Sequence, residues 1–477
     1  MSFGRIIFLI CIALGIAALV WTGVWHIFSL FVWEFPMLSW LPLLAVIVVG
    51  YGAGTVRALV AGGQDTPAVA PAAATEGAAT PVVATEAPSF RPRFWFGPGL
   101  LAGIIVLLLG LWFTLISPTR MPLDDIDFKV VDTLPQQTQP RLLPRSGITD
   151  DPAFRDADEI HLVRNPATGG LLWTGEWEGS WTGGESQGVS VKPLDDVLSK
   201  SHILRAGFDH SVGGITPSTL KGKAKIKHPF SRIQYPVLVP DGPDGAFAMA
   251  PYVGYSGFPF KHPYLKGVLV YHQDGTLEDL TPEEAASRPE LVRTGRIVPE
   301  AVARAEAEAL ADHFGGEIND AEDNKQPYLT SIDRDRTVWL TVIDSKSSSE
   351  GAKGIVLTDS STNQTDVWLT PPNQKLISTQ EVINDARSLP LQWEAERCCD
   401  SDGNSYTVTL REVVEPRLAF KDGHPYYMVT VVPTDDLALP REVEYTLVID
   451  ALTGKRIAKY DHVNDPAADA KLEAFFR

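Results

Sequence analysis

The stretch LVIDALTGKRIAKY, Leu447–Tyr460, shows the structural device that organises this chain. Two apolar, β-branched runs flank a short segment of Asp, Thr and Gly. Because β-branched residues pack well on a pleated surface and Gly supplies the positive φ of a tight turn, the stretch predicts a β-hairpin. The same device recurs as LVRNPATGGLLW (Leu162–Trp173), VLVYHQDGTLEDL (Val268–Leu280) and IVLTDSSTNQTDVW (Ile355–Trp368). Four copies indicate an internal repeat.

A predicted helix precedes each of the last two hairpins. Pro299–Phe314 begins with Pro at the first helical position and ends at two glycines. The helix at Ser378–Leu389 opens with Ser378 and Glu381, the signature of a capping box. We therefore expect two copies of one helix-on-sheet unit, packed side by side.

The apolar residues of these segments predict which faces meet. At helical spacing the faces are Val302, Ala305, Ala309 and Leu310 in the first helix, and Val382, Ile383, Ala386 and Leu389 in the second. At strand spacing the expected partners are Val338, Leu340 and Val342 in the first unit, and Val429, Val431, Leu447 and Ile449 in the second.

The second unit resembles a known module. Its helix carries Ile377, Ser378, Glu381, Ile383 and Ala386, and its last hairpin closes on VIDALTGK (Val448–Lys455). This pattern is similar to the PepSY domain over 377–461 and more weakly over 297–370, with a long insert at 393–425. The resemblance implies a helix packed on a short antiparallel sheet and an interaction or regulatory role, and it carries no catalytic residue.

Three uncharged apolar runs, Ile6–Trp33, Met37–Val56 and Phe94–Ser117, precede these units. Each reaches the roughly 20 residues that cross about 30 Å of hydrocarbon, and the first is too long for a signal peptide. Arg5, Arg57, Arg91 and Arg93 fall on one side of such an anchor and Arg120 on the other. This bias predicts a multi-pass cell-membrane protein with a cytoplasmic N-terminus and an extracytoplasmic C-terminal domain.

The predicted fold class is therefore a three-helix membrane anchor plus an α+β, β-rich extracytoplasmic domain with repeated hairpins. The expected segments are a helical hairpin (1–61), a disordered linker rich in Ala, Thr and Pro (62–93), a third membrane helix (94–117), a stalk (118–157), a β-rich domain (158–296) and the two PepSY-like repeats (297–370 and 371–477).

Charge and cysteine content exclude some classes of protein. The formal net charge of −18 argues against a nucleic-acid partner, because phosphate binding needs a basic face. Cys398 and Cys399 are adjacent, and a disulfide between neighbours is geometrically unfavourable, so we expect no disulfide framework.

Two short motifs suggest chemistry, and each has a plainer interpretation. Gly184–Gly188 matches G-x-S-x-G around Ser186, but a strand-like segment broken by Pro193 follows where a nucleophile elbow needs a helix. Asp400, Asp402 and Asn404 place three oxygen-bearing side chains at alternate positions, as a calcium loop does. The Gly and Glu of an EF-hand are missing, which favours an ordinary hairpin loop; calcium is the one cofactor considered.

Two further groups suggest a ligand or interaction surface. Trp173, Trp177 and Trp181 would share one face of a strand, either as an exposed row that binds glycan or as core residues, which burial of most of the area of a Trp side chain favours. Lys221, Lys223, Lys225 and Lys227 would form a positive stripe on a strand, facing lipid headgroups or an anionic polymer, or blunting a sheet edge.

These observations favour a non-catalytic, membrane-anchored protein that binds or regulates an envelope or secreted protein, or serves as a subunit of an envelope complex. The expected partners are the lipid bilayer and that protein. The alternative is a hydrolase of cell-envelope peptide or glycan, which would need a pocket of converging titratable groups.

Overall fold

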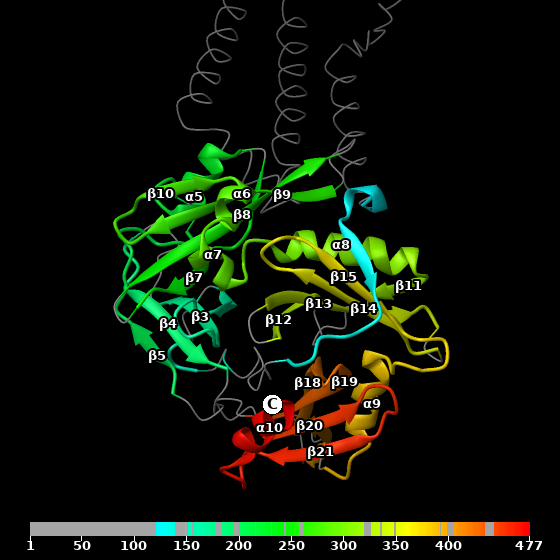
Figure 1. Ribbon diagram of the computed structural model, residues 1–477. Helices are drawn as coiled ribbons and strands as arrows, with labels where there is room; N and C mark the ends of the chain where they lie inside the picture. Colours follow the sequence, from blue (N-terminus) through cyan, green and yellow to red (C-terminus); the bar gives the residue numbers. More distant parts are fainter. Residues whose placement is uncertain are drawn as a thin grey trace, which may run out of the picture. The chain divides into compact units, whose positions relative to one another are not determined.

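The computed structural model describes residues 121–477 apart from 139–147, 149–150, 155–156, 158, 178–183, 195–199, 215, 230, 243–244, 257–261, 319–325, 334–335, 348–349, 392, 398–404 and 435–442. Most of the described regular structure is β-strand, arranged in four sheets of four or more strands (Figure 1). We name them sheets I to IV in chain order.

Sheets I and II are built from strands β2 to β10, and all of their strand pairs are antiparallel. Sheet I contains β2 (Ile160–Arg164), β3 (Leu171–Trp177), β4 (Gly188–Pro193) and β5 (His202–Leu204). Sheet II contains β6 (Arg232–Ile233), β7 (Val237–Pro240), β8 (Ala246–Ser256), β9 (His262–His272) and β10 (Leu277–Leu280), with β6 and β7 both paired to β8. Three short helices accompany sheet II: α5 (Leu220–Lys227), α6 (Pro282–Ala286) and α7 (Pro289–Thr294).

Sheets III and IV each follow a longer helix. After α8 (Glu300–His313), sheet III contains β11 (Gly316–Ile318), β12 (Tyr328–Ile332), β13 (Arg336–Ser345), β14 (Ala352–Asp359) and β15 (Thr365–Leu369), with β1 (Phe128–Val131) added beyond β15. After α9 (Thr379–Arg387) and the small pair β16 (Glu394–Arg397) and β17 (Tyr406–Thr409), sheet IV contains β18 (Arg411–Lys421), β19 (His424–Pro433), β20 (Tyr445–Asp450) and β21 (Arg456–Asp461). A 3₁₀ turn, η3 (Leu123–Asp125), precedes β1, and α10 (Ala468–Phe476) ends the chain.

The hydrophobic cores join the sheets in chain order. One core joins sheets I and II, one joins sheets III and IV, and a third joins sheet IV and α10 to sheet I. Between sheets II and III the contact is made by α8, whose Val302 packs with Val253 of β8. The four sheets therefore pack in a cycle, an arrangement like that of a four-bladed propeller.

All four predicted hairpins are confirmed, as β2–β3, β9–β10, β14–β15 and β20–β21. Three share a six-residue loop that begins at Asn165, Asp359 or Asp450. The side-chain Oδ1 of that residue accepts hydrogen bonds from the backbone N–H groups two and three positions later. The fifth loop residue has positive φ and is Gly169, Asn363 or Gly454. Asn tolerates this conformation better than other side chains do, which explains its use in sheet III.

Both predicted helices are confirmed, and α9 has the expected capping box between Ser378 and Glu381. The apolar face of α9 packs with Val429, Val431, Leu447 and Ile449 of sheet IV, as predicted. The predicted partners of α8 are wrong. Val338, Leu340 and Val342 face the core shared with α9 and sheet IV, whereas α8 covers the opposite face, where Ile343, Val356 and Val367 lie. Both faces of β13 are buried, so alternation could not indicate which one meets the helix.

The predicted fold class needs correction. No helix formed by the described residues is long and apolar enough to cross a membrane. The three-helix anchor and the multi-pass localisation are corrected on this finding, and the mostly-β cycle of four sheets replaces the α+β assignment. The runs 6–33, 37–56 and 94–117, on which the anchor rested, lie outside the described residues, as does the linker 62–93.

The predicted stalk is also corrected over its described part. β1 pairs with β15 in parallel, and Gln137 and Thr138 form bridges with Lys421 and Ile332. Polar, Pro-rich composition suggested an extended spacer, but this segment is extended because it lies against the sheets.

We expect Ile383→Asp to destabilise the protein by more than about 3 kcal/mol, because it places an unpaired charge in the core between sheets III and IV. Urea unfolding followed by circular dichroism measures the loss. Asn384→Asp, at an exposed position of the same helix, is the control and should change stability by less than about 0.5 kcal/mol. Equal effects of the two changes would show that α9 does not pack as described.

Candidate functional site

The nominated residues that the structure describes lie in separate parts of the fold and do not form one site. Asp400, Asp402 and Asn404, with the neighbouring cysteines and Trp181, lie outside the described residues. Trp173 is 4% exposed and belongs to the core between sheets I and IV, so it is a packing residue. Trp177 lies on the same strand and is partly buried.

The predicted lysine stripe is wrong in its secondary structure. Lys221–Lys227 lies in helix α5, where Lys221 and Lys225 are buried. Lys221 and Lys223 lie over the rings of Tyr235 and Tyr271, and Lys227 forms an ion pair with Asp279 at 2.8 Å. These lysines fasten α5 to sheet II and do not present one positive face. Alternation of Lys with uncharged residues fits a strand by period, but the Thr219 cap starts a helix here.

Ser186 is buried between sheets I and II, where it bridges to Phe208. No helix follows it, so the nucleophile elbow is absent; β4 follows instead. Its neighbour is the buried carboxylate of Glu176, which accepts hydrogen bonds from the backbone N–H groups of Val212 and Gly213 at 2.7 and 3.1 Å. Burial raises the pKa of Glu176, while these bonds and the hydroxyls of Ser211 and Ser186 favour its charged form. The group anchors the 212–213 loop.

A second row of polar side chains has the order of a catalytic triad. The Nε2 atom of His462 lies 2.9 Å from the Thr446 hydroxyl, and its Nδ1 lies 2.6 Å from Asp469 Oδ1. Thr446 has no exposed surface, so a substrate cannot reach its hydroxyl in this structure. The row ties β20 and the end of β21 to α10.

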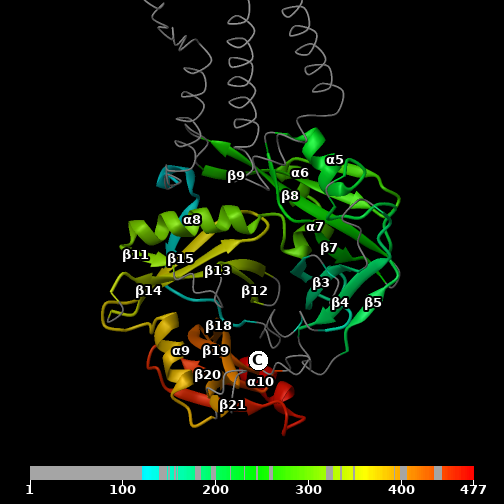
Figure 2. The same ribbon diagram turned by 180° about the vertical axis from the view of Figure 1, so that it is seen from behind.

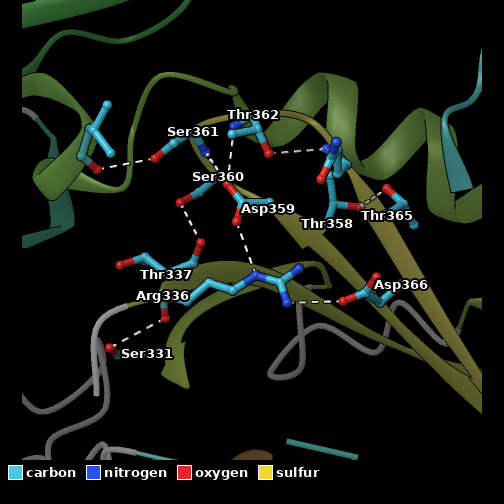
Figure 3. A network of polar contacts seen from close by, with 12 residues as sticks. Ser331, Arg336, Thr337, Thr358, Asp359, Ser360, Ser361, Thr362, Thr365 and Asp366 are labelled. Atoms are coloured by element: carbon cyan, nitrogen blue, oxygen red, sulfur yellow. Dashed lines mark hydrogen bonds and ion pairs between the residues drawn. The ribbon is translucent and has the colours of Figure 1, made fainter. Parts of the chain in front are cut away.

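A network of charged and polar groups surrounds the β14–β15 loop (Figure 3). Asp359 Oδ1 caps the loop through the N–H groups of Ser361 and Thr362, while its Oδ2 accepts from Arg336 Nε at 3.0 Å. The Ser360 hydroxyl donates to the Thr337 carbonyl. One carboxylate thus holds the turn and also orients an arginine on the neighbouring strand.

Arg336 joins two acidic residues of this hairpin. Its Nη1 donates to Asp366 Oδ2 at 2.9 Å, so the guanidinium bridges the loop and β15. Burial disfavours the charged guanidinium, but Asp366 and Asp359 outweigh burial and raise the pKa of Arg336. The arginine is therefore a fixed cation at the end of sheet III.

Glu306 of α8 lies beneath the same loop and is 1% exposed. Its carboxylate accepts from Asn363 Nδ2 at 2.6 Å and from the Thr365 hydroxyl at 3.1 Å. Burial raises the pKa of Glu306 to about 7, the two hydrogen bonds act against this rise, and the negative charge of Asp127 adds to it. Glu306 can therefore take up a proton near neutral pH.

The edge of β15 beside this network is occupied by β1. The pairing is parallel, from Phe128 opposite Thr365 to Val131 opposite Trp368, and Thr365 N–H donates to the Asp127 carbonyl at 3.0 Å. Lys129 Nζ lies 3.3 Å from Asp366 Oδ1. We call this edge, with Glu306, Arg336, Asp359 and Asp366, the β15 edge site. It can hold an extended segment through backbone bonds and a charge pair.

The sequence analysis did not identify the residues of the β15 edge site. Glu306 had a visible signal, since it lies four residues after Val302 and four before Leu310, on the helix face that is otherwise apolar. Asp359 stands in the quoted hairpin, but its bond to Arg336 depends on sheet register, which the sequence does not state.

Comparisons with known proteins add little. No family model matches the chain, and no curated protein matches it. One solved structure, the endo-arabinase from Bacteroides thetaiotaomicron VPI-5482, is similar at 10% identity and a TM-score of 0.19, over 63% of this chain and 81% of that one. The likeness is too slight to transfer that protein's reaction.

We expect Glu306→Gln to raise the free energy of unfolding, relative to the wild type, by more at pH 8 than at pH 5. The raised pKa means that the folded state holds a proton which the unfolded state releases between about pH 4.5 and pH 7, so the wild type loses stability as pH rises through that window. The rise of the Glu306 pKa from 4.5 to about 7 corresponds to a loss of about 3 kcal/mol in the free energy of unfolding. Urea unfolding of both proteins at the two pH values measures the difference.

The control for this comparison is Glu308→Gln, on the exposed side of the same helix. Its stability difference from the wild type should not change between pH 5 and pH 8 by more than about 0.5 kcal/mol. A pH-independent effect of Glu306→Gln would contradict a buried carboxyl with a pKa near 7.

Asn363→Gly tests separately the two roles of Asn363, its positive φ in the turn and its hydrogen bond to Glu306. Glycine keeps the positive φ, as Gly169 and Gly454 do in the other two loops, but removes the amide that bonds Glu306. We expect a loss of about 1–3 kcal/mol at pH 8, where Glu306 is charged, and a smaller loss at pH 5. Equal losses at both pH values would assign Asn363 to the turn alone.

Proposed function

We propose that this chain is a non-catalytic binding protein whose helix-on-sheet units hold extended segments of polypeptide as added strands. The observation that carries the proposal is the parallel pairing of β1 with the edge of β15. The units concerned are the ones that resemble PepSY modules, for which an interaction or regulatory role is expected. A partner protein would supply such a segment in trans.

The contacts of β1 are those of peptide recognition by strand addition. Backbone hydrogen bonds supply affinity, and side chains at alternate positions supply selectivity. The Phe128 ring meets Phe314 at the end of α8 edge to face, with 6.5 Å between ring centroids. Lys129 pairs with Asp366, and because this pair is largely exposed at Lys129 it selects register more than it adds stability.

The register also indicates which amides hold β1. Thr365 N–H donates to the carbonyl of Asp127, so the amides of Lys129 and Val131 face β15 and the amide of Val130 faces away. Val131→Pro therefore removes a ladder bond, whereas Val130→Pro removes none. The two changes are a matched pair.

The test uses a fluorescent peptide with the sequence of residues 124–134, added to the full chain. We expect it to bind the Val131→Pro chain, whose β15 edge is exposed, at least tenfold more tightly than it binds the wild type or the Val130→Pro chain. Changing Asp366 to Asn in the Val131→Pro chain should weaken binding several-fold, because the Lys129 charge pair is lost. Fluorescence anisotropy measures both effects.

The proposal fails if the peptide does not bind a Val131→Pro chain that retains the circular dichroism of the wild type. Should Val131→Pro unfold the protein, Lys129→Glu replaces it, since that change sets like charges opposite each other at Asp366 without altering the backbone. Absence of peptide binding to that folded variant would likewise reject strand capture.

A further inference from the structure

Strand β21 has the same position in sheet IV that β15 has in sheet III. Each is the last strand of its sheet, and each follows a six-residue loop capped by an aspartate, Asp359 or Asp450. β15 carries β1 on its outer edge. Within the described part of the chain, β21 pairs with β20 and with no other strand.

The backbone groups of β21 alternate between β20 and the outer edge of the sheet, where no other described strand pairs with them. His462 N–H donates to the Glu444 carbonyl, so inward-facing residues alternate back along the strand through Tyr460 and Ala458. Lys459, opposite Leu447, therefore directs its N–H and C=O away from β20. Such an edge is a template for another strand.

The exposed side chains along this edge are basic or apolar, while Asp461 at the end of the strand is partly buried and accepts hydrogen bonds from the backbone N–H groups of Val463 and Asn464. Lys455, Arg456 and Lys459 are exposed, and Ile457 is 44% exposed. The Lys459 ammonium lies 3.7 Å from the centroid of the Tyr445 ring, which holds it above the sheet. These positive charges stand out in a chain with a net charge of −18.

The two edges differ in the sign of their charge. The β15 edge carries Asp366 and takes a strand with Lys129 at the matching place. The β21 edge carries Arg456 and Lys459, and complementary charge there requires Asp or Glu.

We propose that the outer edge of β21 binds an acidic, extended segment of a partner protein as an added strand. This inference rests on the proposed function, because it assigns to the second unit the strand capture argued for the first. A second copy of this chain fits less well. Pairing two β21 strands about Lys459, whose backbone groups face outward, sets Lys459 against Lys459 and Ile457 against Asp461.

The test compares two labelled nine-residue peptides, one alternating Glu with Val and one alternating Lys with Val, added to the full chain. We expect the Glu peptide to bind at least tenfold more tightly. The sign of this difference is diagnostic, because the net charge of the chain would by itself favour the Lys peptide. Fluorescence anisotropy at two salt concentrations measures the affinities.

Variants locate the binding to β21. Lys459→Pro removes the outward N–H without affecting the ladder to β20, and should abolish binding. The double change Arg456→Glu with Lys459→Glu should reverse the preference between the peptides, and serves also if the proline variant does not fold. Lys471→Glu, an exposed lysine on α10, is the control and should leave binding unchanged.

Three outcomes would overturn the inference: tighter binding of the Lys peptide, undiminished binding by a folded Lys459→Pro chain, or a dimer in sedimentation that Lys459→Pro dissolves. The last would make a second copy the occupant. If the Glu peptide does not bind but the 124–134 peptide binds the Val131→Pro chain, only the β21 site is rejected. If the 124–134 peptide does not bind but the Glu peptide does, strand capture by the first unit is rejected and the β21 site stands.

Discussion

The exposed edge of a β-sheet carries backbone N–H and C=O groups that need partners, and this constraint distinguishes sheet III from sheet IV. Where sheets pack face to face in the cycle, the cores bury their side chains but do not satisfy the outer strands. In sheet III the partner is β1, and the carbonyl of Asp127, just before this strand, accepts a hydrogen bond from Thr365 N–H. In sheet IV the outer edge of β21 can also pair with an added strand, but its exposed charged side chains are basic, whereas the β15 edge carries Asp366. Figure 2 shows from behind how the helices and strands of the two units follow one another.

The aspartate-capped loop makes the two units comparable. In both, a carboxylate at the first loop position bonds two backbone N–H groups and so sets where the last strand begins. In sheet III the same carboxylate also holds Arg336, and an asparagine at the fifth position reaches the buried Glu306. The turn, the arginine bridge and a carboxyl with a pKa of about 7 thus meet where β1 docks, which places the docked strand beside a group that titrates near neutrality.

Local patterns predicted the local structure well. The hairpins and both helices followed from turn residues, β-branched runs and, for α9, the Ser378–Glu381 capping box, because each depends on neighbours in the chain. Properties that depend on distant partners did not follow. Alternation along β13 could not assign Val338 and Leu340 to one of two buried faces. One local pattern also failed: the lysines at 221–227 matched a strand by period but lie in a helix that begins after the Thr219 cap. The β15 edge site combines α8, β1, β13 and β15, and its only local signal was Glu306 on an apolar helix face.

Amide hydrogen exchange of the protein without added ligand tests the central claim most directly, namely that the β15 edge is filled and the β21 edge is open. The Thr365 amide donates to β1 and the Lys459 amide faces away from β20, although the two strands hold the same position in their sheets. We predict that the Lys459 amide exchanges at least a hundredfold faster than the Thr365 amide under conditions where the protein stays folded. Equal protection of the two amides would contradict it, because both edges would then be covered alike.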